Sequence, residues 1–237
     1  MTRPLIGICG EFAVIHVYDS NVAAHFSLTN YARAVEKAGG VPVILPITTD
    51  ERAVAVMADR VDGVLVSGGV DVDPSAYGQP RAPEVGETQP DRDAFEFALI
   101  RRLVERNTPT LAVCRGIQSV AVAMGGSLRQ HVDGHMRSEL HNDTAHRATI
   151  EPDSRLASIV GTTSLEVNSL HHQVVERPPA TSRVVAHDDD GNVEALEFPD
   201  ADRVLAVQWH PEMLRHRPRH LALFEDLVSN AASAGAG

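Results

Sequence analysis

Short apolar segments alternate with longer amphipathic segments along the first half of the chain. The apolar segments are bounded by Gly, Pro or Asp and have the length of buried strands, whereas the segments between them carry apolar residues at helical spacing. The pattern predicts strands at 5–9, 41–45, 61–66 and 110–113. It predicts helices at 28–38 with Ser27 as N-cap, at 50–59 with Asp50 as N-cap, at 91–106 and at 117–124. Strands and helices in alternation indicate an α/β fold with a mostly parallel sheet, whose ligands bind at the carboxyl ends of the strands.

The second half of the chain has a different pattern. Short β-type segments follow one another at 164–168, 183–187, 193–198 and 204–208, and the turn sequence at 188–192 predicts a hairpin between the middle two. A closing helix is expected at 218–232, followed by a disordered tail at 233–237. Segment 10–25 is interpreted as a loop near the cleft, and 71–90 as a long irregular loop. The length favours a single domain over 1–232.

Cys114 lies between a buried strand and a helix, at a turn that Gly116 keeps uncrowded. A side chain at such a turn is presented to a cleft, and its backbone N–H groups point into the same space, as in a nucleophile elbow. The first turn of the helix places partial positive charge beside the sulfur, which favours the thiolate. Buried cysteines are also common core residues, so this stretch alone leaves both interpretations open.

A base for this cysteine is found near the C-terminus. His210 and Glu212 follow the apolar segment 204–208, so both side chains are expected to reach the same cleft. Glu212 would then accept from one imidazole nitrogen while the other nitrogen faces Cys114, which is the arrangement of nucleophile, base and orienting carboxylate. The two stretches together favour catalysis. The glycines at 68 and 69 also end a predicted strand, and the amide of Gly69 or Val70, with that of Arg115, is expected to form an oxyanion hole.

The chain resembles the class I glutamine amidotransferase-like superfamily, with its flavodoxin-like sheet, and most closely the gamma-glutamyl-gamma-aminobutyrate hydrolase family. The resemblance runs from about residue 3 to about residue 230 and is carried by SGGVDVDPSAYG at 67–78, DRDAFE at 91–96, CRGIQ at 114–118, VNSLHHQ at 167–173 and QWHPE at 208–212. The family usually has Gly-Ile before the nucleophile and an Asn in the following helix, where this chain has Ala112-Val113 and Ala121. The change at Ala121 removes a polar group beneath the site.

The resemblance implies hydrolysis of a γ-glutamyl amine through a γ-glutamyl thioester, as in putrescine and polyamine catabolism, with no cofactor. It also implies a small antiparallel extension of the sheet. The implied substrate-binding residues are Gln118, Asn168, Ser169, His171 and His172. Two alternatives stay open: a glutaminase subunit that supplies ammonia to a partner synthase, and a non-catalytic module that binds a γ-glutamyl metabolite. A polar loop that satisfies its own backbone is the alternative interpretation of 168–173.

Composition excludes several other classes. The formal net charge of −11 leaves no basic stripe for a nucleic acid, and no run of about 18 apolar residues or secretory leader suggests a membrane or export. The chain is therefore expected in the cytoplasm, with both cysteines reduced and Cys9 in the core. His131, His135, His141 and His146 fit no compact metal-binding spacing, so no metal site is predicted. A homodimer is left open.

Overall fold

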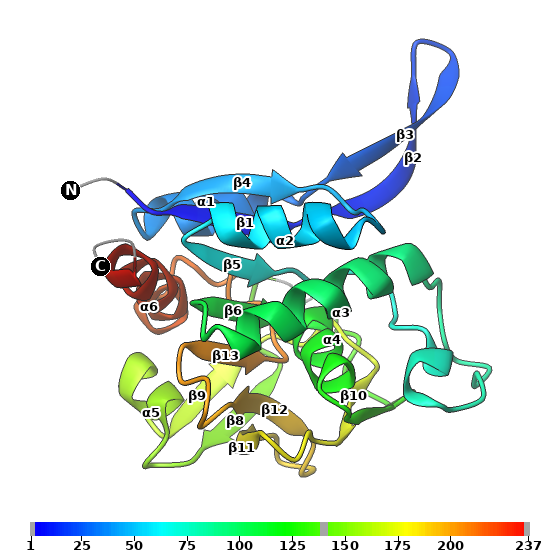
Figure 1. Cartoon of the computed structure of the whole chain (residues 1–237). Coiled ribbons are helices and arrows are strands. Elements are labelled where there is room, and N and C mark those ends of the chain that lie inside the picture. The colour runs from blue at the N-terminus through cyan, green and yellow to red at the C-terminus, as the bar shows by residue number, and fades with distance from the viewer. Residues whose placement is uncertain (1–2, 138–141, 235–237) are drawn as a thin grey trace.

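The structure is a computed structural model that describes residues 3–137 and 142–234. Its centre is a nine-stranded sheet (Figure 1). In spatial order the strands are β4 (Val41–Leu45), β1 (Leu5–Cys9), β5 (Gly63–Val66), β6 (Thr110–Val113), β13 (Val204–Val207), β12 (Val193–Glu197), β11 (Arg183–His187), β8 (His146–Ile150) and β9 (Ser164–Val167).

The sheet has a parallel and an antiparallel half. Strands β4, β1, β5, β6 and β13 pair in parallel, and each pairing from β13 through β12, β11 and β8 to β9 is antiparallel. The central strands β5, β6 and β13 are buried on both faces, which is why their sequences are continuous apolar runs. This architecture confirms the predicted α/β fold with a mostly parallel sheet and an antiparallel extension.

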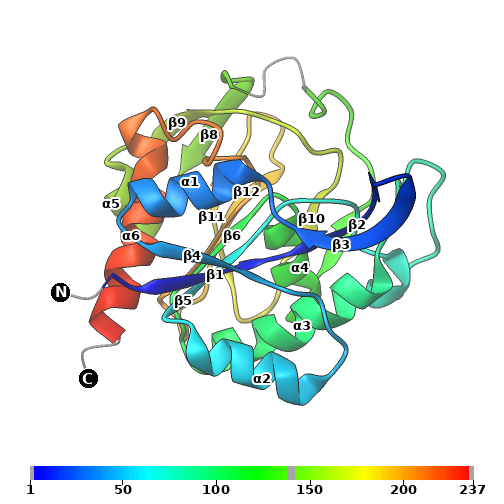
Figure 2. The ribbon, with the colours of Figure 1, turned by 90° about the horizontal axis from the view of Figure 1, so that it is seen from above.

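Helices cover both faces of the sheet (Figure 2). One face carries α1 (Thr29–Lys37), α5 (Arg155–Val160) and α6 (Pro218–Ala234), and the other carries α2 (Glu51–Arg60), α3 (Pro90–Glu105) and α4 (Arg115–Ala123). Each set of helices closes a separate apolar core against its face. A short 3-10 helix, η1 (Pro74–Tyr77), interrupts the otherwise irregular loop at 71–89.

Most predicted elements are present, with ends that differ by a few residues. Asp50 caps α2 as expected, by accepting from the Arg52 N–H, but the expected N-cap of α1 is wrong. That position belongs to Leu28, while the Ser27 hydroxyl turns to the Leu28 carbonyl. The pattern missed α5, β8 and the two-stranded sheet of β7 (Ser127–Arg129) with β10 (Val174–Arg177), because these elements are short and partly polar.

The interpretation of 10–25 as a loop is wrong. This segment forms a β-hairpin of β2 (Glu11–Val17) and β3 (Ser20–Phe26), which projects from the sheet beyond β1 in Figure 1. Tyr18 and Asp19 at its tip both have left-handed backbone angles, as the favoured two-residue hairpin turn requires. Both faces of this ribbon are partly exposed, so apolar and polar residues do not alternate in the regular way that marks a half-buried strand.

The chain ends differ in part from the prediction. Helix α6 continues to Ala234, so the first two residues of the predicted tail are helical, and 235–237 lie outside the described residues. Among the described residues, every helix is too short or too polar to span a lipid bilayer.

Candidate active site

Cys114 stands at the carboxyl end of β6, on a turn that holds it in an unusual backbone conformation. Its φ of 54° and ψ of −108° lie outside the regions that side-chain-bearing residues prefer, which is how a nucleophile elbow presents its side chain. The Cys114 N–H donates to the Val207 carbonyl at 2.9 Å, so the turn is tied to the neighbouring strand β13. A Cβ on Gly116 would overlap the Val66 carbonyl, which explains the glycine at that position.

His210 reaches the cysteine from the end of β13. A Cβ added at Gly68 would lie 2.9 Å from Cε1 of His210 and 3.5 Å from Cβ of Cys114, so the imidazole and the cysteine are close neighbours. The Nδ1 atom of His210 lies 2.6 Å from Oε1 of Glu212. Since Nδ1 is engaged by the carboxylate, Nε2 is the nitrogen available to the sulfur. All three side chains are buried. The structure therefore brings together the three residues expected to form the catalytic triad.

Two further side chains hold this imidazole in place. Asn168 bonds the backbone of His210 on both sides, because its Oδ1 accepts from the His210 N–H at 2.8 Å and its Nδ2 donates to the His210 carbonyl at 3.1 Å. The hydroxyl of Tyr31 accepts from the Gly68 N–H at 2.9 Å and lies 3.5 Å from His210 Nδ1. Tyr31 thus connects the histidine with the loop at the end of β5. Tyr31 lies within the helix predicted at 28–38, and no motif around it indicated this contact.

The electrostatics of the triad favour a charged histidine. Burial by itself would lower the pKa of His210, but the charges of Cys114 and Glu212 and their hydrogen bonds raise it well above its usual value. An imidazolium next to sulfur can serve as a proton donor. This is the protonation state that the first half of a thiol-dependent acyl transfer requires.

Three backbone amides around Cys114 are candidates for an oxyanion hole. The Gly68 N–H is occupied by Tyr31, whereas the amides of Gly69, Val70 and Arg115 donate to no acceptor within the described residues. Gly69 has a φ of 148°, and a Cβ there would overlap the guanidinium of Arg92. Only glycine therefore fits this position without displacing the arginine. The arrangement agrees with the expected donors, of which either Gly69 or Val70 would pair with Arg115.

A buried network of charges supports these loops from beneath. Arg92 donates to the Gly68 carbonyl at 2.7 Å and to Glu96 at 2.8 Å, and Arg115 forms ion pairs with Asp93 and Glu96. Burial alone would raise the pKa of Glu96, but the two guanidinium groups hold it below its usual value. The Arg115 side chain is consequently not free to face an anionic ligand, and only its backbone amide is. Charged residues in the first turn are common in helices in general, but in α3 two of them, Arg92 and Asp93, belong to this network.

The expected substrate-binding residues are engaged mainly with the protein itself. Gln118 is buried and donates to the Gln173 carbonyl at 2.9 Å, and Asn168 holds His210. Ser169 donates to the His135 carbonyl at 2.7 Å, and His171 Nδ1 lies 3.1 Å from the Gln173 carbonyl. His172 is half-buried, and its Nε2 lies 3.1 Å from both carboxylate oxygens of Asp71. Since Asp71 directly follows Gly69 and Val70, this contact places His172 near the loop that ends β5.

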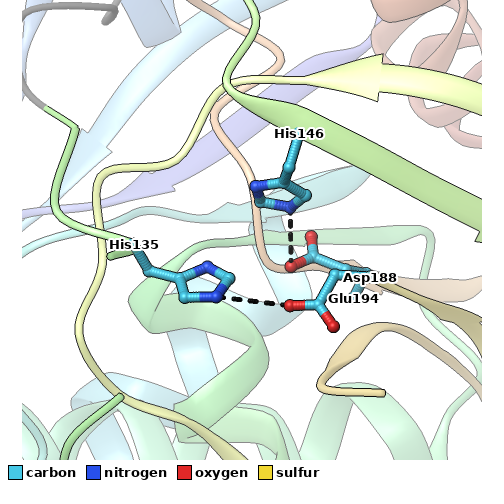
Figure 3. Close-up of side chains that lie close together, drawn as sticks. All are labelled: His135, His146, Asp188 and Glu194. Carbon is cyan, nitrogen blue, oxygen red and sulfur yellow. Dashed lines mark hydrogen bonds and ion pairs between the residues drawn. The ribbon is translucent and has the colours of Figure 1, made fainter. Parts of the chain in front are cut away.

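A second group of imidazoles and carboxylates lies behind the 168–173 loop. One donor atom from each of His135, His146, Asp188 and Glu194 lies within 4.8 Å of all the others (Figure 3). The spacing of the histidines did not indicate this group, because its carboxylates come from later strands. His141 lies outside the described residues. A cavity of about 670 Å³ lies beside Arg92 and the hairpin residues Phe12 and His25, and Cys114 is not among the residues that line it.

Comparison with known proteins shows which family shares these features. The family model of Peptidase C26 matches residues 4–212. A Mycobacterium tuberculosis protein named "putative glutamine amidotransferase" is 38% identical over 100% of this chain and 77% of its own length. Protein NtpR of Enterococcus hirae is 35% identical over 89% of this chain and 91% of its own. The gamma-glutamyl-gamma-aminobutyrate hydrolase PuuD of Escherichia coli is 30% identical over 90% of this chain and 87% of its own.

A solved structure shares the fold at lower identity. It is described as a putative GMP synthase subunit from Thermoplasma acidophilum, with a TM-score of 0.70, 16% identity, and coverage of 100% of this chain and 98% of that one. With the match over 4–212, the similarity of fold and the elbow at Cys114, the chain belongs to the Peptidase C26 family of glutamine amidotransferase-like amide hydrolases.

Proposed function

We propose that this protein hydrolyses the γ-glutamyl amide bond of a γ-glutamyl amine, with Cys114 as nucleophile, His210 as acid and base, and Glu212 as the carboxylate that orients His210. The observation that carries the proposal is the place of Cys114, on its strained elbow, beside an imidazole whose Nδ1 lies 2.6 Å from Glu212. No metal or cofactor takes part in the proposed steps.

In the first half of the reaction, the Cys114 sulfur attacks the δ-carbonyl carbon of the γ-glutamyl group, and an S–C bond forms. The carbonyl electron pair moves to oxygen, where the amide of Arg115 and that of Gly69 or Val70 stabilise the negative charge. The C–N bond then breaks as the intermediate collapses. Protonated His210 gives its proton to the departing nitrogen, so the amine leaves neutral and a γ-glutamyl thioester remains.

In the second half, the neutral His210 takes a proton from water, and the hydroxide attacks the thioester carbonyl. The same amides hold the second oxyanion, and the S–C bond breaks to release glutamate and regenerate the Cys114 thiolate beside the imidazolium. Glu212 keeps the Nδ1–H tautomer in place through both halves and stabilises the charge on the ring.

The choice of a γ-glutamyl amine over other amides is supported by similarity. The Escherichia coli relative is named as a gamma-glutamyl-gamma-aminobutyrate hydrolase, and at 30% identity that activity comes to this chain as a proposal only. The motifs after the nucleophile and at 167–173 resemble the same branch. We also propose that the protein acts in the cytoplasm on a small molecule.

The test is a hydrolysis screen of the purified protein against γ-glutamyl-γ-aminobutyrate, γ-glutamyl-putrescine and glutamine, with glutamate release as readout. Cys114→Ala should abolish release. Cys9→Ala is the matched control, because Cys9 is the chain's other cysteine and its buried side chain lies in the core. Turnover of a γ-glutamyl amine that is lost only in the Cys114 variant supports the proposal and identifies the leaving group.

Two other outcomes distinguish the alternatives. Activity on glutamine alone would move the protein to the ammonia-supplying glutaminases and call for a search for a partner synthase. A folded protein that binds γ-glutamyl compounds but releases no glutamate from any of them would identify a non-catalytic binding module.

A further inference from the structure

Five polar side chains converge at one place in the antiparallel half of the molecule, apart from the triad. His146 begins β8, Glu194 lies within β12, and Asp188 follows β11 in the hairpin turn. His135 and His171 come from the segments after β7 and β9. The imidazole of His135 lies with its ring centre 5.2 Å from that of His146 and 5.0 Å from that of His171. Figure 3 shows His135 and His146 pointing toward the two carboxylates.

The spacing of the donor atoms matches a small coordination sphere. His135 Nε2 lies 3.3 Å from Asp188 Oδ2, and His146 Nε2 lies 3.2 Å from Glu194 Oε1. In a tetrahedral site whose donors are each about 2.0–2.1 Å from Zn²⁺, neighbouring donors are about 3.3 Å apart. All four donor atoms lie within 4.8 Å of one another, so small side-chain movements would bring them around one ion.

The outer contacts of these side chains orient their donor atoms inward. His135 Nδ1 lies 3.3 Å from the Ser169 hydroxyl, and His171 Nδ1 lies 3.1 Å from the Gln173 carbonyl, which leaves the Nε2 atom of each ring for the cluster. Asp188 Oδ1 accepts from the backbone amides of Asp190 and Asn192 at 2.9 and 2.7 Å. Hydrogen bonds to the far side of a ligand are the usual means by which proteins fix metal-binding imidazoles and carboxylates.

Two buried atoms of the cluster lack a partner. Glu194 Oε2 and His171 Nε2 are fully buried and make no hydrogen bond within the described residues, and His171 Nε2 lies 3.9 Å from the other oxygen of Glu194. A buried acceptor without a donor is costly. A cation would satisfy both unpartnered atoms.

We propose that His135, His146, Asp188 and Glu194 bind one divalent transition-metal ion, with Zn²⁺ as the best match and His171 as an additional donor. Imidazole nitrogen favours zinc over Mg²⁺ and Ca²⁺, which prefer oxygen ligands. A cavity of 220 Å³ lined by His135, His146 and Asp188 gives the ion a path from solvent.

The ion would have a structural role. The 168–173 loop contacts the cluster through Ser169 and His171 and holds His210 through Asn168, so a metal would clamp the antiparallel strands to the segment that positions the triad histidine.

The experiment starts from full-length protein freed of metal with a chelator. Equilibrium dialysis with Zn²⁺, read by elemental analysis, is expected to give one tightly bound ion per chain, and Co²⁺ is expected to show the intense visible absorption of tetrahedral coordination. The thermal unfolding midpoint should rise when Zn²⁺ is added. Glu194→Gln and His135→Gln should each weaken binding by about 100-fold or more, since even the outer partners of a ligand contribute about 10–100-fold.

His216→Gln is the matched control, because it removes an exposed imidazole outside the cluster and should bind Zn²⁺ as the wild type does. Circular dichroism of the metal-free variants separates lost binding from lost folding. If Glu194→Gln does not fold, His135→Gln, on a loop, keeps the test decisive. The proposal is overturned if the wild type binds no stoichiometric Zn²⁺, or if the cluster variants bind it as tightly as the control.

Discussion

The triad and the His135/His146/Asp188/Glu194 cluster both set buried imidazoles against buried carboxylates, but the two sites are suited to different chemistry. In the triad one imidazole lies between a thiol and a carboxylate, and the pKa of His210 is raised despite its burial. At the cluster, burial and the neighbouring imidazoles lower the pKa of His135 and of the adjacent His171. Burial would also lower the pKa of His146, but its hydrogen bond to Glu194 and the charge of that carboxylate raise it. The triad therefore favours a charged imidazole, whereas at the cluster the pKa of each imidazole is set by its own neighbours.

The largest effect on the triad is expected from Glu212→Gln, which tests the role of the carboxylate that orients His210. The amide keeps the shape of the side chain but removes the charge that supports the imidazolium, and it presents a donor or a neutral acceptor to Nδ1. We expect the turnover of the γ-glutamyl substrate to fall by about 10³–10⁴-fold, as when the orienting carboxylate of a triad is neutralised. Steady-state kinetics at several pH values would measure it.

Glu166→Gln makes the same chemical change on an exposed side chain paired with Arg147 and should leave turnover unchanged. Full activity of Glu212→Gln would remove this carboxylate from the proposed mechanism.

The triad has candidate oxyanion donors at Gly69 and Val70, and the cluster has no equivalent of them. Gly69→Ala tests whether this loop contributes to catalysis. A Cβ at Gly69 would overlap the Arg92 guanidinium and would have to accept a φ of 148°. The loop would shift, and we expect kcat to fall by about 10²–10³-fold, the effect of losing one oxyanion donor. The matched control is Gly78→Ala, whose φ is also positive but whose Cβ would meet no atom within 4 Å. Equal losses in both variants would assign the effect to backbone strain alone.

Tyr31→Phe tests whether the connection between His210 and the Gly68 loop contributes to activity. The variant leaves the buried Gly68 N–H without its acceptor, which costs about 1–3 kcal/mol of unfolding free energy. We expect about a 10-fold loss of kcat, since about 1.4 kcal/mol corresponds to tenfold in rate. Tyr18→Phe, at the fully exposed hairpin tip, is the control. A stability loss without any change in kcat would make Tyr31 purely structural.

The smallest effect is a difference in how stability depends on pH at the two sites. His210 has a raised pKa when folded, so its contribution is complete below the unfolded value of about 6.5 and is lost as pH rises through the raised value. His171 has a lowered pKa, so its contribution is present above about 6.5 and is lost as pH falls through the lowered value.

Urea unfolding of metal-free protein across this pH range is the measurement. His210→Gln should flatten the alkaline loss of stability, and His171→Gln should flatten the acid loss. His16→Gln, on the exposed hairpin, should change neither. The same slope in both site variants would contradict the contrast between the two sites.

The elbow could be predicted because all its signals are local. The strand at 110–113, the cysteine and the glycine at 116 are neighbours in sequence, and the conformation at Cys114 follows from their order. The functions of Asn168 and Tyr31 could not be predicted in this way. Asn168 was expected to bind substrate, and its place after β9 also sets it against the His210 backbone. Tyr31 reaches Gly68 from α1, which packs against β1 and β4.

The hairpin at 11–26 was not predicted, for a related reason. A strand that packs on a core alternates apolar and polar residues, and this alternation shows which face is buried. A ribbon with two partly exposed faces lacks that alternation. Hydrogen bonding between β2 and β3, rather than burial, fixes their register.

Periodicity and short motifs, which are properties of neighbouring residues, were enough to predict the alternation of strands and helices, the nucleophile elbow and the residues expected to complete a triad. Which charges support Gly68 and Gly69, and which histidines and carboxylates meet at the cluster, followed from the packing of the folded chain. Those contacts join residues tens of positions apart, and their distances depend on sheet order and strand register, which no local pattern encodes.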